Sequence, residues 1–350
     1  MRIATFNLEN LGKPTPDGAS AEDRIRLLRP QLLRLRADVL CLQEVDSQRP
    51  EGSQERTLAA LDTLLADTPY AQFERAVTRS RSTGRFRDKH NLVTLSQLPI
   101  QEHRQLQHDL VAPPLHRAIV AGGERTTAED AGPQPVEWDR PAQHVILDTG
   151  VGDAGSGDAG EAGPGRPLHV VNVHLRAPRA AFVEGAKANA STWRSLGGWA
   201  EGFYLAALKR CGQALEVRLL LDALFDADED ALIVVCGDFN ADVHEVPVRL
   251  IRGDEEDAGN PHLTSRILVP VERSLADSRR YSVVHHGRPQ MLDHLLVSRA
   301  LLGWYRGLEV HNEALGDELM TPQAVRGSGE SFHAPVVADF ALPGEVESPH

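Results

Sequence analysis

The chain has 350 residues and a mass of 38.3 kDa; 41% of its residues are hydrophobic and 25% are charged. These proportions are typical of a globular protein with a substantial core, so global disorder is excluded. The formal net charge of -13 disfavours a protein that coats nucleic acid by bulk attraction, although it leaves room for a local basic patch.

The features that bear on location point to the cytoplasm. Cys41, Cys211 and Cys236 are too few and too scattered for a disulfide scaffold or a zinc site. The first residues lack the pattern of a signal peptide, and no apolar run is long enough to cross a bilayer. We therefore expect a cytoplasmic monomer that does not insert into membranes.

The N-terminal part of the chain predicts alternating strands and helices. Residues 2–7 alternate between apolar and polar side chains, as in a strand. Ser20 and Asp23 have the spacing of a capping box, and leucines on one face then predict a helix over 22–36. The apolar run that follows predicts a buried strand over 38–44.

The middle of the chain continues this alternation. A second helix is predicted over 56–66 and a strand over 92–96. Two further strands, over 143–149 and 168–174, flank a tract rich in Gly, Ala and Asp at about 150–165. This tract cannot bury apolar surface, so it predicts a loop.

The C-terminal part contains the strongest strand pattern. Residues 177–202 look irregular, and a helix is predicted over 203–225. The apolar run 232–236 then predicts a fully buried strand. Two late strands are expected over 291–297 and 335–340.

Polar side chains suited to phosphate or metal chemistry occur at the ends of these predicted strands. They are Asn7, Glu44, His174, Asp238 with Asn240, and Asp293. One such residue would mean little, because each taken alone is as readily a turn former or a solvated charge. Several in one chain are better explained by strand ends that converge on one cleft.

The same residues lie in short motifs that run through nearly the whole chain. In order, these are Thr5-Phe-Asn7-Leu, Leu42-Gln-Glu44, Asn91 with Leu95-Ser96, Val173-His174-Leu, Gly237-Asp238-Phe-Asn240, Leu292-Asp293-His and Ser331-Phe-His333-Ala-Pro335. The ordered set resembles the endonuclease/exonuclease/phosphatase superfamily, which includes pancreatic-type DNase, exonuclease III-like repair nucleases, bacterial sphingomyelinases and inositol polyphosphate 5-phosphatases. Gly-Asp-Phe-Asn after an apolar strand is its most specific single motif.

The resemblance implies a fold and a reaction. The fold is α/β: a four-layer α/β sandwich in which two mostly antiparallel mixed sheets lie face to face with helices on the outside. We expect a single domain over residues 1–343, followed by a disordered tail over 344–350. The reaction is metal-dependent hydrolysis of phosphodiester or phosphomonoester bonds.

The resemblance also implies a cofactor and roles for the site residues. Glu44 would hold Mg²⁺, or Mn²⁺, through hard oxygen ligands, and Asn7 would bind or orient the metal shell. The remaining expected roles belong to five residues. Asp238 activates the attacking water, Asn240 donates to a phosphate oxygen, His174 and His333 stabilise developing charge or protonate the leaving group, and Asp293 pairs with His333.

Two residues separate this chain from parts of the superfamily. His174 is typical of the DNase, sphingomyelinase and phosphatase branches, whereas exonuclease III-like enzymes resemble one another in carrying Tyr there. Phe332 stands where the family pattern Ser-Asp-His-x-Pro has an acid. The missing carboxylate puts a two-metal arrangement in question.

The substrate is less specified by the sequence. A basic stretch contains Arg85 and Arg87 and is followed by Asn91. These residues could contact phosphate, or the stretch could be a solvated loop. Trp193 and Trp199 fit either base stacking or a small packed loop.

Three interpretations of function therefore stay open. The first is a nuclease-like phosphodiesterase that acts on DNA or RNA. The second is a phosphoesterase for a small molecule or lipid headgroup, and the third is a weakly active binding protein with a degenerate site.

Overall fold

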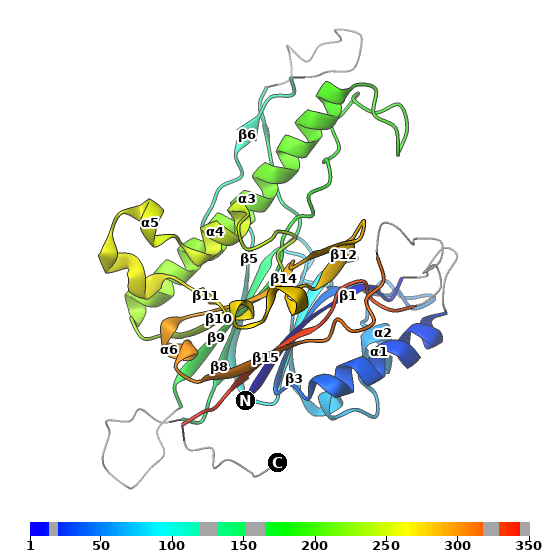
Figure 1. Ribbon diagram of the computed structural model, residues 1–350. Helices are drawn as coiled ribbons and strands as arrows, with labels where there is room; N and C mark the ends of the chain where they lie inside the picture. The colour runs from blue at the N-terminus through cyan, green and yellow to red at the C-terminus, as the bar shows by residue number, and fades with distance from the viewer. Residues whose placement is uncertain (14–19, 120–131, 152–164, 318–328, 344–350) are drawn as a thin grey trace.

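Two six-stranded β-sheets stacked face to face form the centre of the protein (Figure 1). The computed structural model describes residues 1–13, 20–119, 132–151, 165–317 and 329–343. The first sheet has the strand order β15 (Tyr305–Val310), β16 (Val336–Phe340), β1 (Arg2–Leu11), β2 (Val39–Val45), β4 (Asn91–Ser96) and β3 (Glu74–Val77). The second has the order β11 (Val269–Pro270), β14 (Asp293–Val297), β10 (Leu232–Asp238), β9 (Pro167–His174), β8 (Ala142–Asp148) and β5 (Ile100–Leu106). The pairs β1–β2 and β9–β10 are parallel, so both sheets are mixed.

Helices cover the outer face of each sheet, which completes the four predicted layers. In Figure 1, α1 (Ala21–Leu35) and α2 (Ala59–Leu65) lie on one side, and α3 (Leu196–Ala227) and α4 (Val246–Arg252) lie on the other. One apolar cluster lies between the sheets, and one lies under each helical layer. The α/β sandwich expected from the sequence is therefore confirmed.

Short elements connect these layers. The short helices are α5 (Glu255–Ala258) and α6 (Arg299–Leu302), and the small hairpins are β6 (Leu115–His116) with β7 (Gln134–Pro135), and β12 (Val283–His285) with β13 (Arg288–Gln290). In the described part of the chain, 3-10 helices span Pro69–Gln72, Pro261–Arg266, Val271–Ser274 and Asp277–Arg279. None of the described helices is long and apolar enough to cross a membrane.

The prediction for α3 was wrong at its N-terminal end. The helix begins at Leu196, inside the segment expected to be irregular, and Ser195 caps it by accepting a hydrogen bond from the Gly198 amide at 3.0 Å. Gly197 and Gly198 lower the intrinsic helix propensity of this first turn, which hid the start of the helix. The tract at 150–165 and the tail at 344–350 lie almost wholly outside the described residues.

A buried set of polar side chains joins the two sheets. The Gln43 amide donates to Asn172 Oδ1 at 2.8 Å, across the sheet interface. Asn172 donates in turn to the carbonyls of Leu42 and Val93, both at 3.3 Å. Because Gln43 precedes Glu44 on β2 and Asn172 precedes His174 on β9, this contact fixes how the two strand ends face each other.

The first and last strands of the described chain, β1 and β16, also pair with each other. β1 pairs with β16 in antiparallel register, with Arg2 opposite Asp339. The Arg2 guanidinium binds the Asp339 carboxylate at 2.8 Å, and the Met1 amino group donates to the Phe340 carbonyl at 2.7 Å. β1 therefore occupies an interior position in its sheet, between β16 and β2.

Candidate active site

Three neighbouring strands of the second sheet bring predicted residues into one row. The parallel pairing of β9 with β10 sets His174 beside Asp238, and the antiparallel pairing of β10 with β14 sets Asp293 on its other side. All three side chains are buried. His174 Nε2 lies 3.3 Å from Asp238 Oδ2.

The first sheet supplies Asn7 and Glu44 from the facing side. Asn7 Nδ2 donates to Asp238 Oδ2 at 3.0 Å, which links the two sheets at the strand ends of the candidate site. Glu44 Oε1 lies 3.5 Å from His174 Nε2. Because the Asn7 oxygen accepts the Glu9 amide at 2.9 Å, this geometry has Asn7 orienting Asp238.

Irregular backbone aims several of these side chains. Glu9, Glu44, His90 and Asn240 have φ between 48° and 57°, the left-handed region that side chains other than glycine seldom adopt. Register shifts in β1 and β2 accompany the first two of these residues. β-bulges and left-handed residues of this kind cluster at functional sites, where they redirect side chains.

Asp238 is held as an anion at the centre of the site. Its Oδ1 accepts the Asn240 amide at 2.8 Å, and its Oδ2 accepts the Asn240 side chain at 3.0 Å. Burial alone would raise the pKa of Asp238, but the charge of His333 and the hydrogen bonds from His174 and Asn240 outweigh it and hold the pKa well below 3.8. A carboxylate in this state can accept a hydrogen bond from an attacking water.

His333, which is partly buried, and the buried Asp293 form a pair next to Asp238. His333 Nδ1 donates to Asp293 Oδ2 at 2.8 Å. Burial opposes a charged imidazole, yet the negative charges of Asp293 and Asp238 raise the pKa of His333 well above 6.5. Burial raises the pKa of Asp293. His333 is therefore protonated at neutral pH, as an acid that donates to a leaving group must be.

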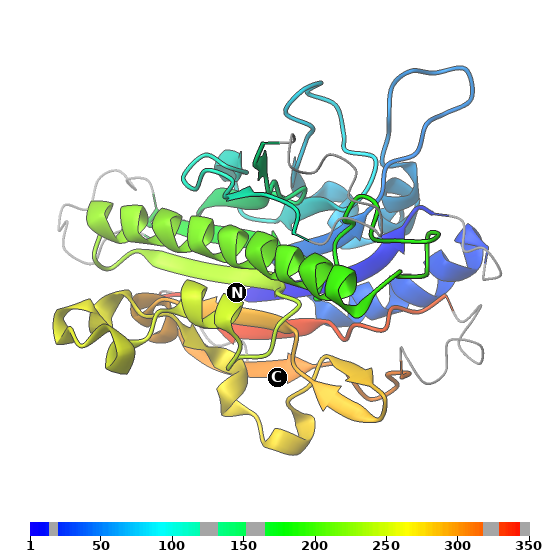
Figure 2. The ribbon, with the colours of Figure 1, turned by 90° about the horizontal axis from the view of Figure 1, so that it is seen from above.

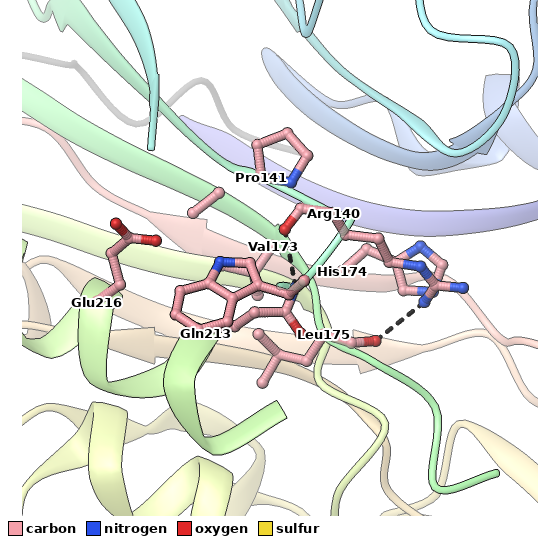
Figure 3. A pocket seen from close by; sticks show the side chains of 9 residues that line it. Arg140, Pro141, Val173, His174, Leu175, Gln213 and Glu216 are labelled. Atoms are coloured by element: carbon pink, nitrogen blue, oxygen red, sulfur yellow. Dashed lines mark hydrogen bonds between the residues drawn. The ribbon is translucent and has the colours of Figure 1, made fainter. Parts of the chain in front are cut away.

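Arg140 enters the site from the segment before β8, and Figure 3 shows its guanidinium beside His174. It is buried, it contacts His174 Nε2, and it donates to the Leu175 carbonyl at 3.0 Å. Gln213 of α3 holds the Arg140 carbonyl at 2.8 Å. A fixed cation at this position complements the charge of a phosphate group.

Glu9, His90 and Arg140 are site residues that sequence reasoning missed. Glu9 Oε2 accepts the main-chain amide of Phe332 at 2.9 Å, so the Glu9 carboxylate lies against the backbone of that residue. His90 Nδ1 lies 3.9 Å from Glu44 Oε1. The bulge in β1 and the left-handed backbone at His90 have no periodic signature, whereas the two-residue spacing of Asn7 and Glu9 was a usable signal.

The structure does not bring all predicted substrate-binding residues to this site. Asn91 is fully buried, and its amide is bound on both sides: it accepts the Arg87 amide and donates to the Val45 and Arg87 carbonyls. It therefore shapes the turn before β4 and has no exposed atom for a ligand. Arg85 is exposed and binds the Gln54 carbonyl, at 3.1 Å. Arg87 binds the Asp139 carbonyl, next to Arg140.

Two groups of side chains offer ligands for a divalent cation. The ligand atoms of Glu44, His90 and His174 lie within 4.8 Å of one another, and so do those of Asp238, Asp293 and His333; with His333 protonated, the second group offers its two carboxylates. Asp293 Oδ1 is buried without a hydrogen-bond partner among the described residues, an arrangement that is costly unless another group binds it. Carboxylate oxygens suit Mg²⁺ and Mn²⁺, so the donor set fits such an ion.

Known proteins share this fold. The profile of the Endonuclease/Exonuclease/phosphatase family matches residues 4–313. The 3'-5' exonuclease NExo from Neisseria meningitidis is 16% identical over 98% of this chain and 100% of its own, with a TM-score of 0.50. The human Nocturnin catalytic domain with bound sulfate is 18% identical over 97% of this chain and 94% of its own, with a TM-score of 0.50. A humanized D. rerio TDP2 is 14% identical over 98% and 99%, with a TM-score of 0.53. No curated protein matches the chain.

Proposed function

We propose, from the premise that the chain belongs to the endonuclease/exonuclease/phosphatase family, that it is a divalent-metal-dependent phosphodiesterase of the nuclease-like kind. The observation that carries the proposal is the placement of Asp238. This ionised carboxylate is held between His174 and Asn7 on one side and the Asp293–His333 pair on the other. An anion next to a protonated histidine can act as the base and the acid in the hydrolysis of a phosphate ester.

Each residue of the site has a separate role in the proposed reaction. Asp238 accepts a proton or hydrogen bond from the attacking water, and Asn240 holds that carboxylate through its amide and side chain. His333, kept protonated by Asp293, donates to the leaving oxygen. Arg140 offsets the charge that develops on the phosphoryl oxygens.

A divalent cation completes this arrangement in the proposal. Glu44 would hold it, with Glu9 and Asn7 close by on the bulged part of β1. When bound, Mg²⁺ or Mn²⁺ supplies Lewis-acid polarisation of a phosphoryl oxygen. The carboxylate of Glu9 at the Phe332 amide argues against the degenerate site that Phe332 alone would indicate.

A small-molecule phosphoesterase is the second candidate, because the net charge of -13 opposes polyanion binding at most of the surface. The protein, with Mg²⁺ and then Mn²⁺, is tested against plasmid DNA, single-stranded RNA, bis-p-nitrophenyl phosphate and p-nitrophenyl phosphate. Asp238→Asn serves as the matched inactive variant, with turnover expected to fall on the order of a hundredfold or more. Cleavage of the small diester without cleavage of nucleic acid would favour the second candidate. No turnover of any substrate would refute both.

A further inference from the structure

The first half of α3, with the loop that precedes it, forms an arm beside the site. We call residues 176–210 the arm. In Figure 1 its helical part rises beyond the strand ends next to β6, and in Figure 2 α3 passes in front of the strands. At the base of the arm, Arg210 donates to the Asn240 carbonyl at 2.6 Å.

The loop of the arm, residues 176–195, packs on one face of α3. An adjacent face of the helix stays exposed. Gly202 has no room for a side chain, because a Cβ there would lie 2.4 Å from the Ala181 carbonyl and 2.8 Å from the Trp193 ring. Trp193 therefore belongs to a packed loop. Trp199 and Phe203, by contrast, are 43% and 40% exposed.

Trp199 and Phe203 form a stacked aromatic pair on that open face. Their ring centroids are 5.5 Å apart, with an interplanar angle of 24°. They are four positions apart, so they are neighbours on the helix surface, and Arg210 falls on the same stripe. At 1.5 Å per residue, Phe203 lies about 10 Å and Trp199 about 16 Å along α3 from Arg210.

The arm has the opposite charge balance to the rest of the chain. It contains six basic residues, namely Arg176, Arg179, Lys187, Arg194, Lys209 and Arg210, against two acidic ones, Glu184 and Glu201. Subtracting these from the totals of 37 and 50 leaves 31 basic and 48 acidic residues elsewhere. Glu201 is buried, and its Oε1 accepts hydrogen bonds from His116 Nε2 at 2.8 Å and from the Ile119 amide at 2.7 Å.

Basic side chains lie between the arm and the centre of the site. Arg140 contacts His174 at the centre of the site, and Arg176 lies two residues after His174 in the chain. Gln213 of α3 joins the two arginines, since it accepts the Arg176 amide at 2.8 Å and donates to the Arg140 carbonyl at 2.8 Å. Besides burial, the charge of Arg176 also lowers the pKa of Arg140 and of Lys209, while the nearby Asp139 opposes both shifts.

We propose that the arm binds the single-stranded part of a nucleic-acid substrate, with bases stacked on Trp199 and Phe203 and the phosphate backbone led to the site by Lys209, Arg176 and Arg140. The inference rests on the proposed phosphodiesterase function and specifies its substrate class. Stacked aromatic rings beside a basic path are how proteins bind single strands without reading sequence. A membrane would also accept exposed aromatic and basic side chains, but it would not require a line of cations leading inward to a catalytic carboxylate.

Binding is measured by fluorescence anisotropy with a labelled oligodeoxythymidylate, in EDTA so that no cleavage occurs. Loss of a base stack costs about 1–3 kcal/mol per base, so Trp199→Ala with Phe203→Ala should weaken binding at least tenfold. Trp199→Phe with Phe203→Tyr keeps both rings and should retain most of the affinity. Lys209→Gln should reduce the slope of log Kd against log salt by about 0.7, as expected for one phosphate contact on a single strand.

Equal binding by wild type and the double alanine variant, or no binding by wild type, would overturn the proposal. So would co-sedimentation with phosphatidylserine vesicles that depends on Trp199 and Phe203 while oligonucleotide affinity does not. Circular dichroism and thermal melting establish that each variant is folded. Wild-type turnover of bis-p-nitrophenyl phosphate is measured separately: its absence rejects the phosphodiesterase, whereas turnover without oligonucleotide binding rejects only the arm.

Discussion

Glu44 reaches the site from a left-handed position in β2, and its two oxygens face different partners. Oε2 accepts the Asn10 amide at 2.9 Å, while Oε1 points toward His174 and His90. Glu44→Gln preserves an acceptor for Asn10 but removes the negative charge. Mn²⁺ binding, followed by electron paramagnetic resonance and by titration calorimetry, should weaken on the order of tenfold. An unchanged dissociation constant with lowered turnover would place the cation on other ligands.

Phe332 and Glu9 are joined by one hydrogen bond. Substitutions at these two positions therefore test whether the lack of an Asp at position 332 limits turnover. Because the Glu9 carboxylate already lies at the Phe332 amide, Phe332→Asp should change turnover of an activated diester by less than a few-fold. Glu9→Gln should lower it, and combining the two changes should restore it. His333→Ala should abolish turnover in every background. Inert wild type rescued by Phe332→Asp would show instead that the site lacks its acid.

At the scale of single strands, β8 carries a histidine whose protonation opposes folding. His144 Nε2 lies 3.1 Å from His169 Nδ1 on β9, and Arg104 of β5 donates to His144 Nδ1 at 3.1 Å. Burial and these two neighbours lower the pKa of His144 to about 3. The unfolded chain, with a histidine pKa of about 6.5, binds more protons between these values. Stability should therefore fall as the pH drops from 6.5 toward 3.

The size of this effect follows from the two pKa values. Between pH 7 and pH 5, His144 should contribute a loss of about 2 kcal/mol in the free energy of unfolding. In His144→Gln, which keeps an acceptor for Arg104, the loss over this range should be smaller by that amount in urea titrations. His262→Gln, at an exposed position, is the matched control. Identical pH dependence in wild type and His144→Gln would contradict the assignment.

The elements differ in how clearly their own sequences predict them. The central strands β2 and β10 contain continuous apolar runs, and β9 is largely apolar around His169 and Asn172; all three are buried along most of their length, and they were predicted. β3, β5 and β15 lie at sheet edges and are partly exposed; their mixed composition gave no clear pattern, and they were missed. The pairing order of the strands is set by contacts distant in the chain and was available only through the family resemblance.

The candidate site divides in the same way. Residues at strand ends, such as His174 and Asp238, could be predicted because a rigid strand determines where its last side chain lies. Arg140 could not, because it arrives on an irregular segment whose position depends on Gln213 of α3. His90 depends likewise on a left-handed turn, for which one sequence holds no periodic signal.

At the scale of the whole molecule, the contact between Gln43 and Asn172 holds the two sheets in register. Asn172→Leu keeps the volume but leaves carbonyls of the facing sheet without their donor, so unfolding should cost about 1–3 kcal/mol less. Gln43→Leu tests the coupling: the double variant should be less destabilised than the sum of the single changes. Additive effects, measured by urea unfolding, would mean that the two amides act independently.

The pairing of β1 with β16 also has a consequence for folding of the nascent chain. During translation β1 emerges 337 residues before Asp339, the residue to which Arg2 binds. One edge of β1 therefore stays without its native partner while the rest of the chain is made, a condition that favours slow folding and invites chaperone binding. His333 lies just before β16, so the same delay keeps the proposed catalytic set incomplete on the ribosome. If the arm binds single strands as proposed, nascent chains can approach messenger RNA without being able to cut it.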